Sequence, residues 1–482
     1  MPAEGAGKPF TFNDLKAGLV NFGGIASTLV IWADAVTKAA QQWIEQEFAG
    51  LDLGDARLDK RAKKLMERLA ANPTASIPQA CDSWSETCAA YRFLRNTDVA
   101  WESILAPHWE RTQERMRSES VVLCIQDTTE LDFNGQDIDG LGPLNYEARR
   151  GLYLHPTYAV TSEREPLGVL DAWMWAREEL DADGGRLGPK ESTRWVEGYE
   201  RVAEMAPDMP DTRLVYVADR EADMVEMMRR AHELGTPADW LVRAKHDRCL
   251  PGGDGAKLWA STTSVEPLGE ITFETGARES QKSRTVRQQL WAREVEIADG
   301  ERGKLKVCCV IAREVGAPAG VKPIEWRLLT NRAVTTEEEA VELIKWYRAR
   351  WEIEIYFHVL KNGCEVETLQ LAAVDRIERA LALFLVVAWR VTYLMRKGRT
   401  CPDLDAALFF DPDEIRGAHL LAKKKMPATA PTVNEVVRLI AQIGGFLGRK
   451  SDGEPGAKTI WRGLDKVLTA ADTLRALREG LD

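Results

Sequence analysis

The sequence lacks the short motifs that mark most nucleotide-driven and covalent enzyme chemistries. It contains no Walker A loop, no GxSxG nucleophile elbow and no HExxH zinc motif. Its eight cysteines form no CxxC pair and its six histidines are dispersed, so a structural zinc site is not expected. The cysteines are instead typical of reduced thiols in a cytoplasmic protein.

A long hydrophobic run is missing as well. Residues 17–33 carry no charge and run into an Ala-Asp-Ala sequence that resembles a signal-peptide cleavage site. One asparagine and two glycines interrupt this stretch, which is short for a membrane span. We expect residues 1–40 to be an N-terminal extension of a soluble protein with no membrane partner, and a signal or anchor is the alternative.

Positive charge is in the minority. The chain has 64 Lys and Arg against 75 Asp and Glu, a net charge of −11, which by itself argues against a nucleic-acid partner. Phosphates respond to local basic patches, however, and not to the net charge of a multidomain chain. One such patch lies within twelve residues and consists of Arg57, Lys60, Arg61, Lys63, Lys64 and Arg68.

What the chain does contain is typical of a globular protein with several domains. It has 482 residues, of which 45% are hydrophobic and 29% charged. Residues 41–105 have helical periodicity, with a basic second helix at 89–95. One apolar helix stripe there consists of Leu58, Ala62, Leu65 and Leu69. We predict a helical domain with a basic surface over residues 41–105.

Residues 106–365 have an α/β pattern. The runs 121–125 and 214–218 are continuously apolar, as in strands buried on both faces, and Asp127 and Asp219 follow their ends. A strand-rich stretch at about 250–332 predicts a β insertion into this unit. The remainder, residues 366–482, is predicted to be a helical C-terminal domain.

A long helix from Thr336 to Lys361 carries the most informative spacing. Tyr347, Arg350, Glu354 and Lys361 fall within an arc of about 60°, at about 100° per residue. Large apolar residues flank this stripe, so it is not a simple solvated face. An Arg350–Glu354 pair at i, i+4 is the ordinary alternative, but the four residues together favour a site where a metal and phosphates meet.

Carboxylates at two strand ends and on this helix supply the oxygen ligands that Mg²⁺ or Mn²⁺ requires. Two ions held by Asp127, Asp219 and Glu354 could activate a water or a 3′-hydroxyl and stabilise the leaving oxygen of a phosphodiester. Such chemistry needs no covalent nucleophile from the protein.

The chain resembles bacterial cut-and-paste transposases of the insertion-sequence-four family, Tn-five type. The family signature is Tyr, two residues, Arg, three residues, Glu, six residues, Lys, and the four helix residues above match it. The family's two Asp motifs appear as IQDTT, with Asp127, and DREAD, with Asp219. The segments LGDARLDKR and AYRFLRN resemble its end-recognition region, and IGGFLG and TIWRGL resemble its dimerisation region.

The resemblance implies an α/β fold: an RNase H-like catalytic core with an inserted β subdomain, flanked by N-terminal and C-terminal helical domains. It implies cleavage of transposon ends through a DNA hairpin, strand transfer into target DNA, two Mg²⁺ ions per active site and a synaptic homodimer. Together with their positions, it assigns DNA contacts to Arg57, Arg61, Arg92, Arg220, Arg243, Lys245, Trp326, Tyr347, Arg350 and Lys361.

Several of these assignments have alternatives. Trp326, expected to stack on a flipped base, could be a core aromatic, and Arg220 could pair with Glu221 or Asp223. Arg243 and Lys245 share one strand face, which would suit a groove or solvent equally. Leu58 stands where the family has a second Arg, so some end contacts must differ.

Two other functions remain open from the sequence. A transposase-derived repressor or inhibitor would bind DNA without cutting it, although the intact carboxylates argue against this. A stand-alone RNase H-like nuclease would cut DNA without joining ends.

Overall fold

The computed structural model describes residues 43–71, 75–181, 185–186, 190–252, 255–275, 284–449 and 452–479. The predicted N-terminal extension over residues 1–40 lies outside this part of the chain. Within it, no helix has both the length and the apolar character needed to cross a membrane.

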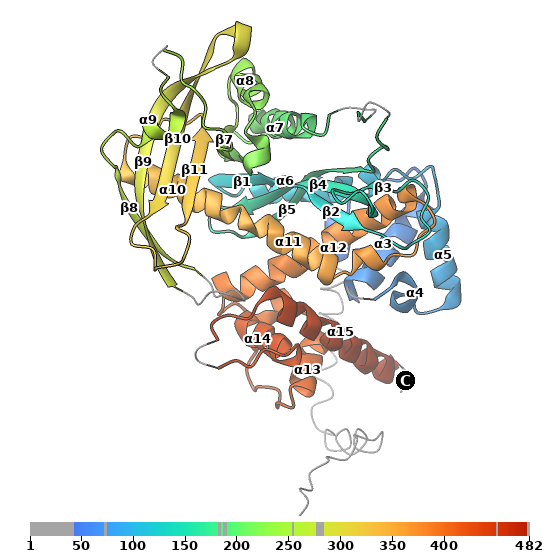
Figure 1. Cartoon of the computed structure of the whole chain (residues 1–482). Helices are drawn as coiled ribbons and strands as arrows, with labels where there is room; N and C mark the ends of the chain where they lie inside the picture. The colour runs from blue at the N-terminus through green and yellow to red at the C-terminus, as the bar shows by residue number, and fades with distance from the viewer. Residues whose placement is uncertain are drawn as a thin grey trace, which may run out of the picture.

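One eleven-stranded mixed sheet runs through the molecule (Figure 1). Strands β1, β6 and β7 are parallel, whereas β4 pairs antiparallel with β1 and β5 pairs antiparallel with β4. This arrangement confirms the predicted RNase H-like core. Its strands are β1 (Val121–Gln126), β4 (Arg150–Thr161), β5 (Pro166–Trp175), β6 (Arg213–Ala218) and β7 (Asp239–Arg243), with the short β2 (Thr129–Asp132) and β3 (Gly142–Pro143) beside β4.

The inserted strands continue this sheet. β11 pairs antiparallel with β7, joining Leu328 to Arg243 and Thr330 to Leu241, and β10, β9 and β8 follow outward. The insertion therefore extends the edge of the catalytic core and places the start of β11 beside the helices that follow it. Its elements are α9 (Leu258–Thr262), β8 (Gly269–Thr275), β9 (Arg284–Ala298), β10 (Lys304–Glu314) and β11 (Glu325–Thr330).

Helices cover both faces of the sheet. Leu123 and Ile125 of β1 belong to one hydrophobic core, and Val122 and Cys124 belong to another, so β1 is buried on both faces as its sequence predicts. The first core includes α6 (Trp101–Met116), α10 (Glu337–Ala349), α11 (Trp351–Asn362) and α12 (Val374–Thr400), and the second includes α7 (Thr193–Met205) and α8 (Val225–Glu233).

Helices also make up both ends of the described chain. In α3 the predicted stripe is confirmed, because Ala62, Leu65 and Leu69 are buried and Leu58 packs against the same core. The N-terminal helices are α3 (Ala56–Ala71), α4 (Ile77–Ala80) and α5 (Trp84–Leu94), and the C-terminal ones are α13 (Pro412–Leu421), α14 (Val433–Ile443) and α15 (Ala457–Glu479). Short 3₁₀ turns are η1 (Ala206–Asp208), η2 (Arg220–Ala222), η3 (Gly300–Arg302), η4 (Val366–Thr368) and η5 (Ala406–Leu408).

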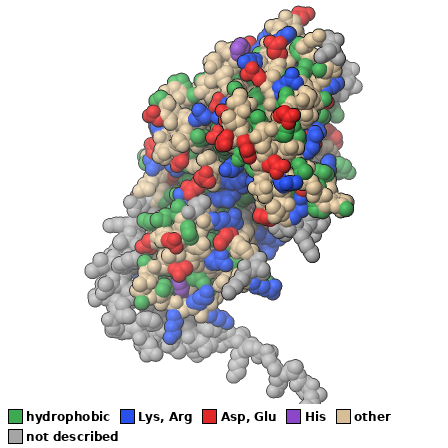
Figure 2. Space-filling model, turned by 90° about the vertical axis from the view of Figure 1, so that its left-hand side faces the viewer, with side chains coloured by type: hydrophobic (Ala, Val, Ile, Leu, Met, Phe, Trp, Pro, Cys, Tyr) green, Lys and Arg blue, Asp and Glu red, His purple; other side chains and the backbone are tan. Residues whose placement is uncertain are grey.

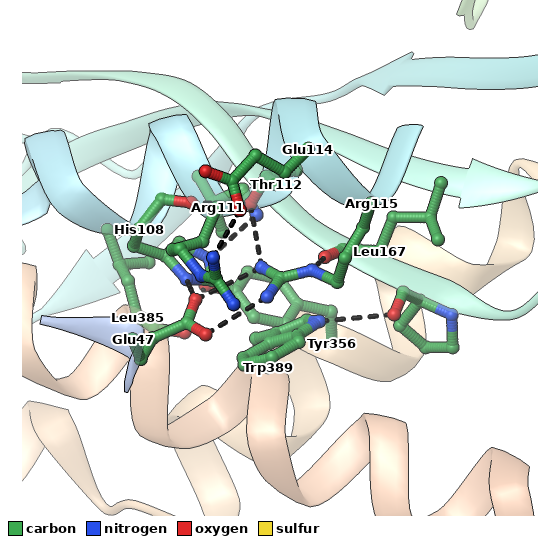
Figure 3. Close-up of polar contacts among 12 residues, drawn as sticks. Glu47, His108, Arg111, Thr112, Glu114, Arg115, Leu167, Tyr356, Leu385 and Trp389 are labelled. Carbon is green, nitrogen blue, oxygen red and sulfur yellow. Dashed lines mark hydrogen bonds and ion pairs between the residues drawn. The ribbon is translucent and has the colours of Figure 1, made fainter. Parts of the chain in front are cut away.

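A buried polar network fastens the helical turn that ends at Glu47 to the core (Figure 3). The Nε2 of His108 accepts from the Val169 N–H at 3.0 Å, so its Nδ1 carries the proton and donates to Glu47 at 2.5 Å. Arg115 donates twice to the same carboxylate, at 3.0 Å each, and lies over the Trp389 ring. Burial alone would raise the pKa of Glu47, but these two partners lower it to about 2.

Candidate active site

Two of the predicted carboxylates leave the sheet at neighbouring points. Gln126 of β1 pairs with Ala218 of β6 in parallel register, and Asp127 and Asp219 are the next residues. Adjacent strands lie about 4.8 Å apart, so these carboxylates begin side by side. Each is held by a backbone N–H: Asp127 accepts from Thr128 at 2.9 Å, and Asp219 accepts from Glu221 at 2.7 Å.

The predicted single helix from Thr336 to Lys361 is two helices, α10 and α11, which meet at Arg350. There the N–H groups of Arg350 and Ile353 bond to carbonyls three residues back, each at 3.2 Å, instead of four. This tighter 3₁₀-type turn ends one helix and starts the next, and such turns within helices often mark functional positions. The side chain at the break is buried, with Arg350 only 7% exposed.

Arg350 joins the helix to the strand end. Its Nη1 donates to Asp127 at 2.6 Å and its Nη2 to Glu354 at 2.7 Å. Burial raises the pKa of Asp127 to about 7. Arg350 opposes this rise, whereas the Asp219 and Glu354 carboxylates add to it. Two of the three predicted carboxylates therefore bond to one guanidinium, and the charges of Asp219 and Glu354 both act on Asp127.

The chemistry of these side chains fits a divalent metal ion, because all three are carboxylates and oxygen is the ligand that Mg²⁺ prefers. Asp127 and Glu354 bond to the same cation, and Asp219 lies near enough to raise the pKa of Asp127. In this arrangement, however, the three carboxylates are not placed to hold a metal ion together. Within the described ranges, no three His, Cys, Asp or Glu side chains stand close enough together to hold a metal. The Arg350 guanidinium bridges Asp127 and Glu354, so an ion shared by these two requires Arg350 to release them.

Aromatic rings line the approach from the inserted strands. Tyr347 is buried beside Arg350, and its ring meets the Trp326 ring edge-on at 6.3 Å. Trp326 stacks on Phe273 of β8 at 5.5 Å and remains partly exposed. Trp326 thus contacts α10 through the ring of Tyr347. Sequence spacing alone does not predict this contact.

Lys361 lies further along α11, beside β2. Its Nζ donates to the Glu130 carbonyl at 2.6 Å and pairs with Glu367 at 3.3 Å. The fourth signature residue therefore fixes the segment that follows Asp127.

The predicted cations Arg243 and Lys245 lie at the end of β7 and in the loop that follows it, and both are exposed. Buried Asp223, the last residue of the DREAD motif, accepts from the N–H of Lys245 at 2.6 Å and pairs with Arg248 at 2.7 Å. Asp223 thus holds this loop in place. Arg220, in the same DREAD motif, is exposed at the surface. This role of Asp223 is not predictable from local sequence, because its partners lie more than twenty residues away.

A buried histidine was also missed. His155 of β4 lies 2.6 Å from the Thr128 hydroxyl, next to Asp127, and packs among Trp173, Trp175 and Trp195. No local sequence pattern signals this contact, because β4 reaches the end of β1 only through the pairing of these two strands in the sheet.

The three predicted end-binding arginines lie on the N-terminal helices, away from the carboxylates in sequence. Arg57 is exposed and pairs with Asp55, Arg61 is half-buried on α3, and Arg92 is exposed on α5. Arg68 of the same basic patch is instead bound to Asp82 and Glu86.

Three segments of the chain match known protein families. Residues 40–99 match the transposase DNA-binding family, 196–389 the transposase DDE domain, and 386–479 the transposase Tn5 dimerisation domain. A solved structure, the cryo-EM structure of piggyBac transposase synaptic complex with hairpin DNA, is similar over 75% of this chain at 9% identity and a TM-score of 0.31. The chain spans 56% of the length of that protein.

Proposed function

Since the chain belongs to the DDE transposases of the Tn5 type, we propose that it cuts the ends of a transposon and joins them to target DNA. The observation that carries the proposal is the shared environment of Asp127, Asp219 and Glu354, which come from two adjacent strand ends and one helix. Clustered negative charge beside a phosphodiester serves no purpose in a protein that only binds DNA.

The DDE domain implies dependence on a divalent metal ion. We assign the metal ligands to Asp127, Asp219 and Glu354, with two Mg²⁺ ions per site and Mn²⁺ as a substitute. Ions held there supply an activated water or 3′-hydroxyl and stabilise the leaving oxygen.

The chain's own side chains orient the DNA. Cations around the carboxylates bind the phosphates on either side of the cleaved bond, and Trp326 receives a base that leaves the stack when the cut strand forms a hairpin. The cations and the phenol in this group are Arg220, Arg243, Lys245, Tyr347, Arg350 and Lys361.

Recognition and pairing of the ends belong to the flanking helices. We assign end contacts to Arg57, Arg61 and Arg92, which lie in the segment that matches the DNA-binding family. The segment that matches the Tn5 dimerisation domain would join two copies in a homodimer holding both ends, with closed twofold symmetry as the default for such a pair.

The test is joining of a labelled transposon end to a target plasmid in Mg²⁺. We expect wild-type protein to nick and join, and Glu354→Gln to lose nicking while binding ends normally. Glu342→Gln is the matched control, since that residue lies on α10 and pairs with Arg332. Near wild-type nicking by Glu354→Gln refutes the site, end binding without nicking by wild type indicates a repressor, and nicking without joining indicates a nuclease.

A further inference from the structure

A second group of cations lies outside the carboxylate site, where three elements meet. Arg164 belongs to the turn between β4 and β5, Arg348 to the end of α10, and Arg396 and Arg399 to the end of α12. We call these four residues the arginine cluster. On this side of the molecule, Lys and Arg side chains gather in the hollow between the sheet and the C-terminal helices (Figure 2).

The members of the cluster differ in how they are paired. Arg396 donates to buried Glu352 at 3.0 Å, and Arg399 donates to the Pro455 carbonyl at 2.6 Å while its Nε is buried without a partner. In the part of the chain that the structure describes, Arg164 and Arg348 form no ion pair.

The four guanidinium groups are close enough to repel one another. Burial lowers the pKa of Arg164, Arg348 and Arg399; Arg396 lowers the values of Arg164 and Arg399 further, and Arg164 lowers that of Arg348. The carboxylates Glu352, Glu163 and Glu454 oppose this only in part. Uncompensated charge in a half-buried hollow is stabilised by an anion from outside the chain.

Two features hold the cluster in place. Arg164 has φ of 69°, a left-handed conformation that hairpin turns usually reserve for Gly or Asn. Arg348 lies over the Phe273 ring at 3.9 Å, so its guanidinium is fixed before any ligand arrives. The cluster is preorganised, which reduces the entropy lost on binding.

We propose that the arginine cluster binds the phosphate backbone of target DNA. This inference rests on the proposed transposase function. Arg348 lies over the Phe273 ring, and the rings of Trp326 and Tyr347 continue from Phe273 to Arg350. A strand at the carboxylates therefore passes within a few side chains of the cluster. Guanidinium contacts to phosphates carry no sequence information, and target DNA is the partner held without sequence recognition, whereas α3 and α5 are the proposed readers of the transposon ends.

The test measures the affinity of full-length protein for two labelled duplexes over a range of salt. One duplex carries the inverted repeat that flanks the gene, and the other is unrelated in sequence. Arg164→Gln with Arg348→Gln removes the two arginines that form no ion pair in the described structure. For the unrelated duplex we expect the slope of log affinity against log salt to fall by about 1.8, since each phosphate contact contributes about 0.9.

Binding of the inverted-repeat duplex should change much less, and nicking of bound ends should stay near wild type. Arg213→Gln with Arg302→Gln removes the same charge from two exposed positions elsewhere and should leave the slope unchanged. Arg164→Lys with Arg348→Lys keeps the charge and should keep the wild-type slope, which separates lost charge from misfolding.

A wild-type slope in the Gln variant overturns the proposal, and so does an equal loss on both duplexes, which would place the cluster on the transposon end. These outcomes do not depend on catalysis. Failure of the transposase function itself would appear separately, as wild-type protein that binds ends but neither nicks nor joins them.

Discussion

Arg350 faces two demands that one side chain cannot meet at once. In the structure its guanidinium bonds to both Asp127 and Glu354, whereas the proposed function needs it on a DNA phosphate and needs the carboxylates on metal ions. A phosphate that attracts Arg350 frees the carboxylates for metal. Linkage then makes the effect reciprocal: DNA strengthens metal binding and metal strengthens DNA binding by the same factor.

We therefore expect Arg350→Gln to bind Mn²⁺ more tightly than wild type when no DNA is present, by about tenfold or more. Hydrogen bonds to charged groups contribute about 1.5–3 kcal/mol each, and the ion no longer competes with them. Titration calorimetry or Mn²⁺ electron paramagnetic resonance measures this without catalysis. Arg332→Gln, which removes a cation bound to Glu342, is the control, and equal affinities for Arg350→Gln and wild type would contradict the prediction.

The role proposed for Trp326 depends on a distortion of the DNA. Extruding a base costs a few kcal/mol, and stacking it on an indole returns about 1–3 kcal/mol. We expect Trp326→Ala to nick normally but to form hairpins at least about tenfold more slowly, with partial rescue by an abasic site at the flipped position. Gel analysis of end-labelled duplexes measures both steps. Equal loss of nicking and hairpinning would instead indicate that Trp326 serves the Phe273 stack as a core residue.

Spacing along the sequence predicted that Tyr347, Arg350, Glu354 and Lys361 share one helix face, but not which contacts they make. It assumed an unbroken helix, and so it could not place Arg350 at the break, where the side chain turns onto Asp127. Contacts such as His155 with Thr128 or Asp223 with Arg248 join distant positions. No local periodicity encodes them.

At the scale of elements, the strands of the core and of the insertion were predictable because they are apolar and bounded by turns. The pairing of β11 with β7, which merges the insertion into the main sheet, was not, because strand order depends on contacts far apart in the chain. Asp219 caps the short turn η2, and α8 begins only at Val225.

The carboxylate of Glu47 joins the turn that ends at this residue to His108 and Arg115. Removing one partner of a buried charged network costs about 3–5 kcal/mol, so Glu47→Gln should lower the free energy of unfolding by about that much at pH 7. Denaturant unfolding, followed by intrinsic tryptophan fluorescence, measures the difference. Glu114→Gln breaks a more exposed pair with Arg111 and should cost less than about 1 kcal/mol.

The pH dependence of this effect has a definite sign. The folded pKa of Glu47 is depressed from 4.5 to about 2, so its stabilisation is fully present above pH 4.5 and is lost as the pH falls toward 2. The difference between wild type and Glu47→Gln should therefore be constant from about pH 7 to 5 and shrink below about pH 4.5. A difference that stays constant down to about pH 3 would exclude the ionised network as its cause.

For the whole molecule, the net charge of −11 does not predict DNA binding. The cations that we propose as DNA contacts are concentrated in a hollow and on two helices. Exposed apolar side chains are similarly concentrated. Thirteen large hydrophobic side chains are exposed in the described residues. Six of them lie between Leu404 and Leu447, inside the segment that matches the Tn5 dimerisation domain. Clustered exposed apolar residues indicate an interaction surface.

Leu447, which is 67% exposed in the IGGFLG segment, is the sharpest probe of that surface. Deleting the C-terminal helices would also uncover α12, since Val436, Ile440 and Val467 share its core, so a surface substitution separates pairing from folding. We expect Leu447→Asp to keep its thermal stability and its binding of one transposon end. Paired-end complexes and the cleavage that depends on them should be lost, as gel shift and cleavage assays would show.

Leu234→Asp is the control, because Leu234 lies directly after the C-terminal end of α8 and is also exposed. This variant should pair ends normally. A free monomer would agree with the prediction, because pairing is required only on DNA; paired-end complexes of Leu447→Asp at the wild-type level would not.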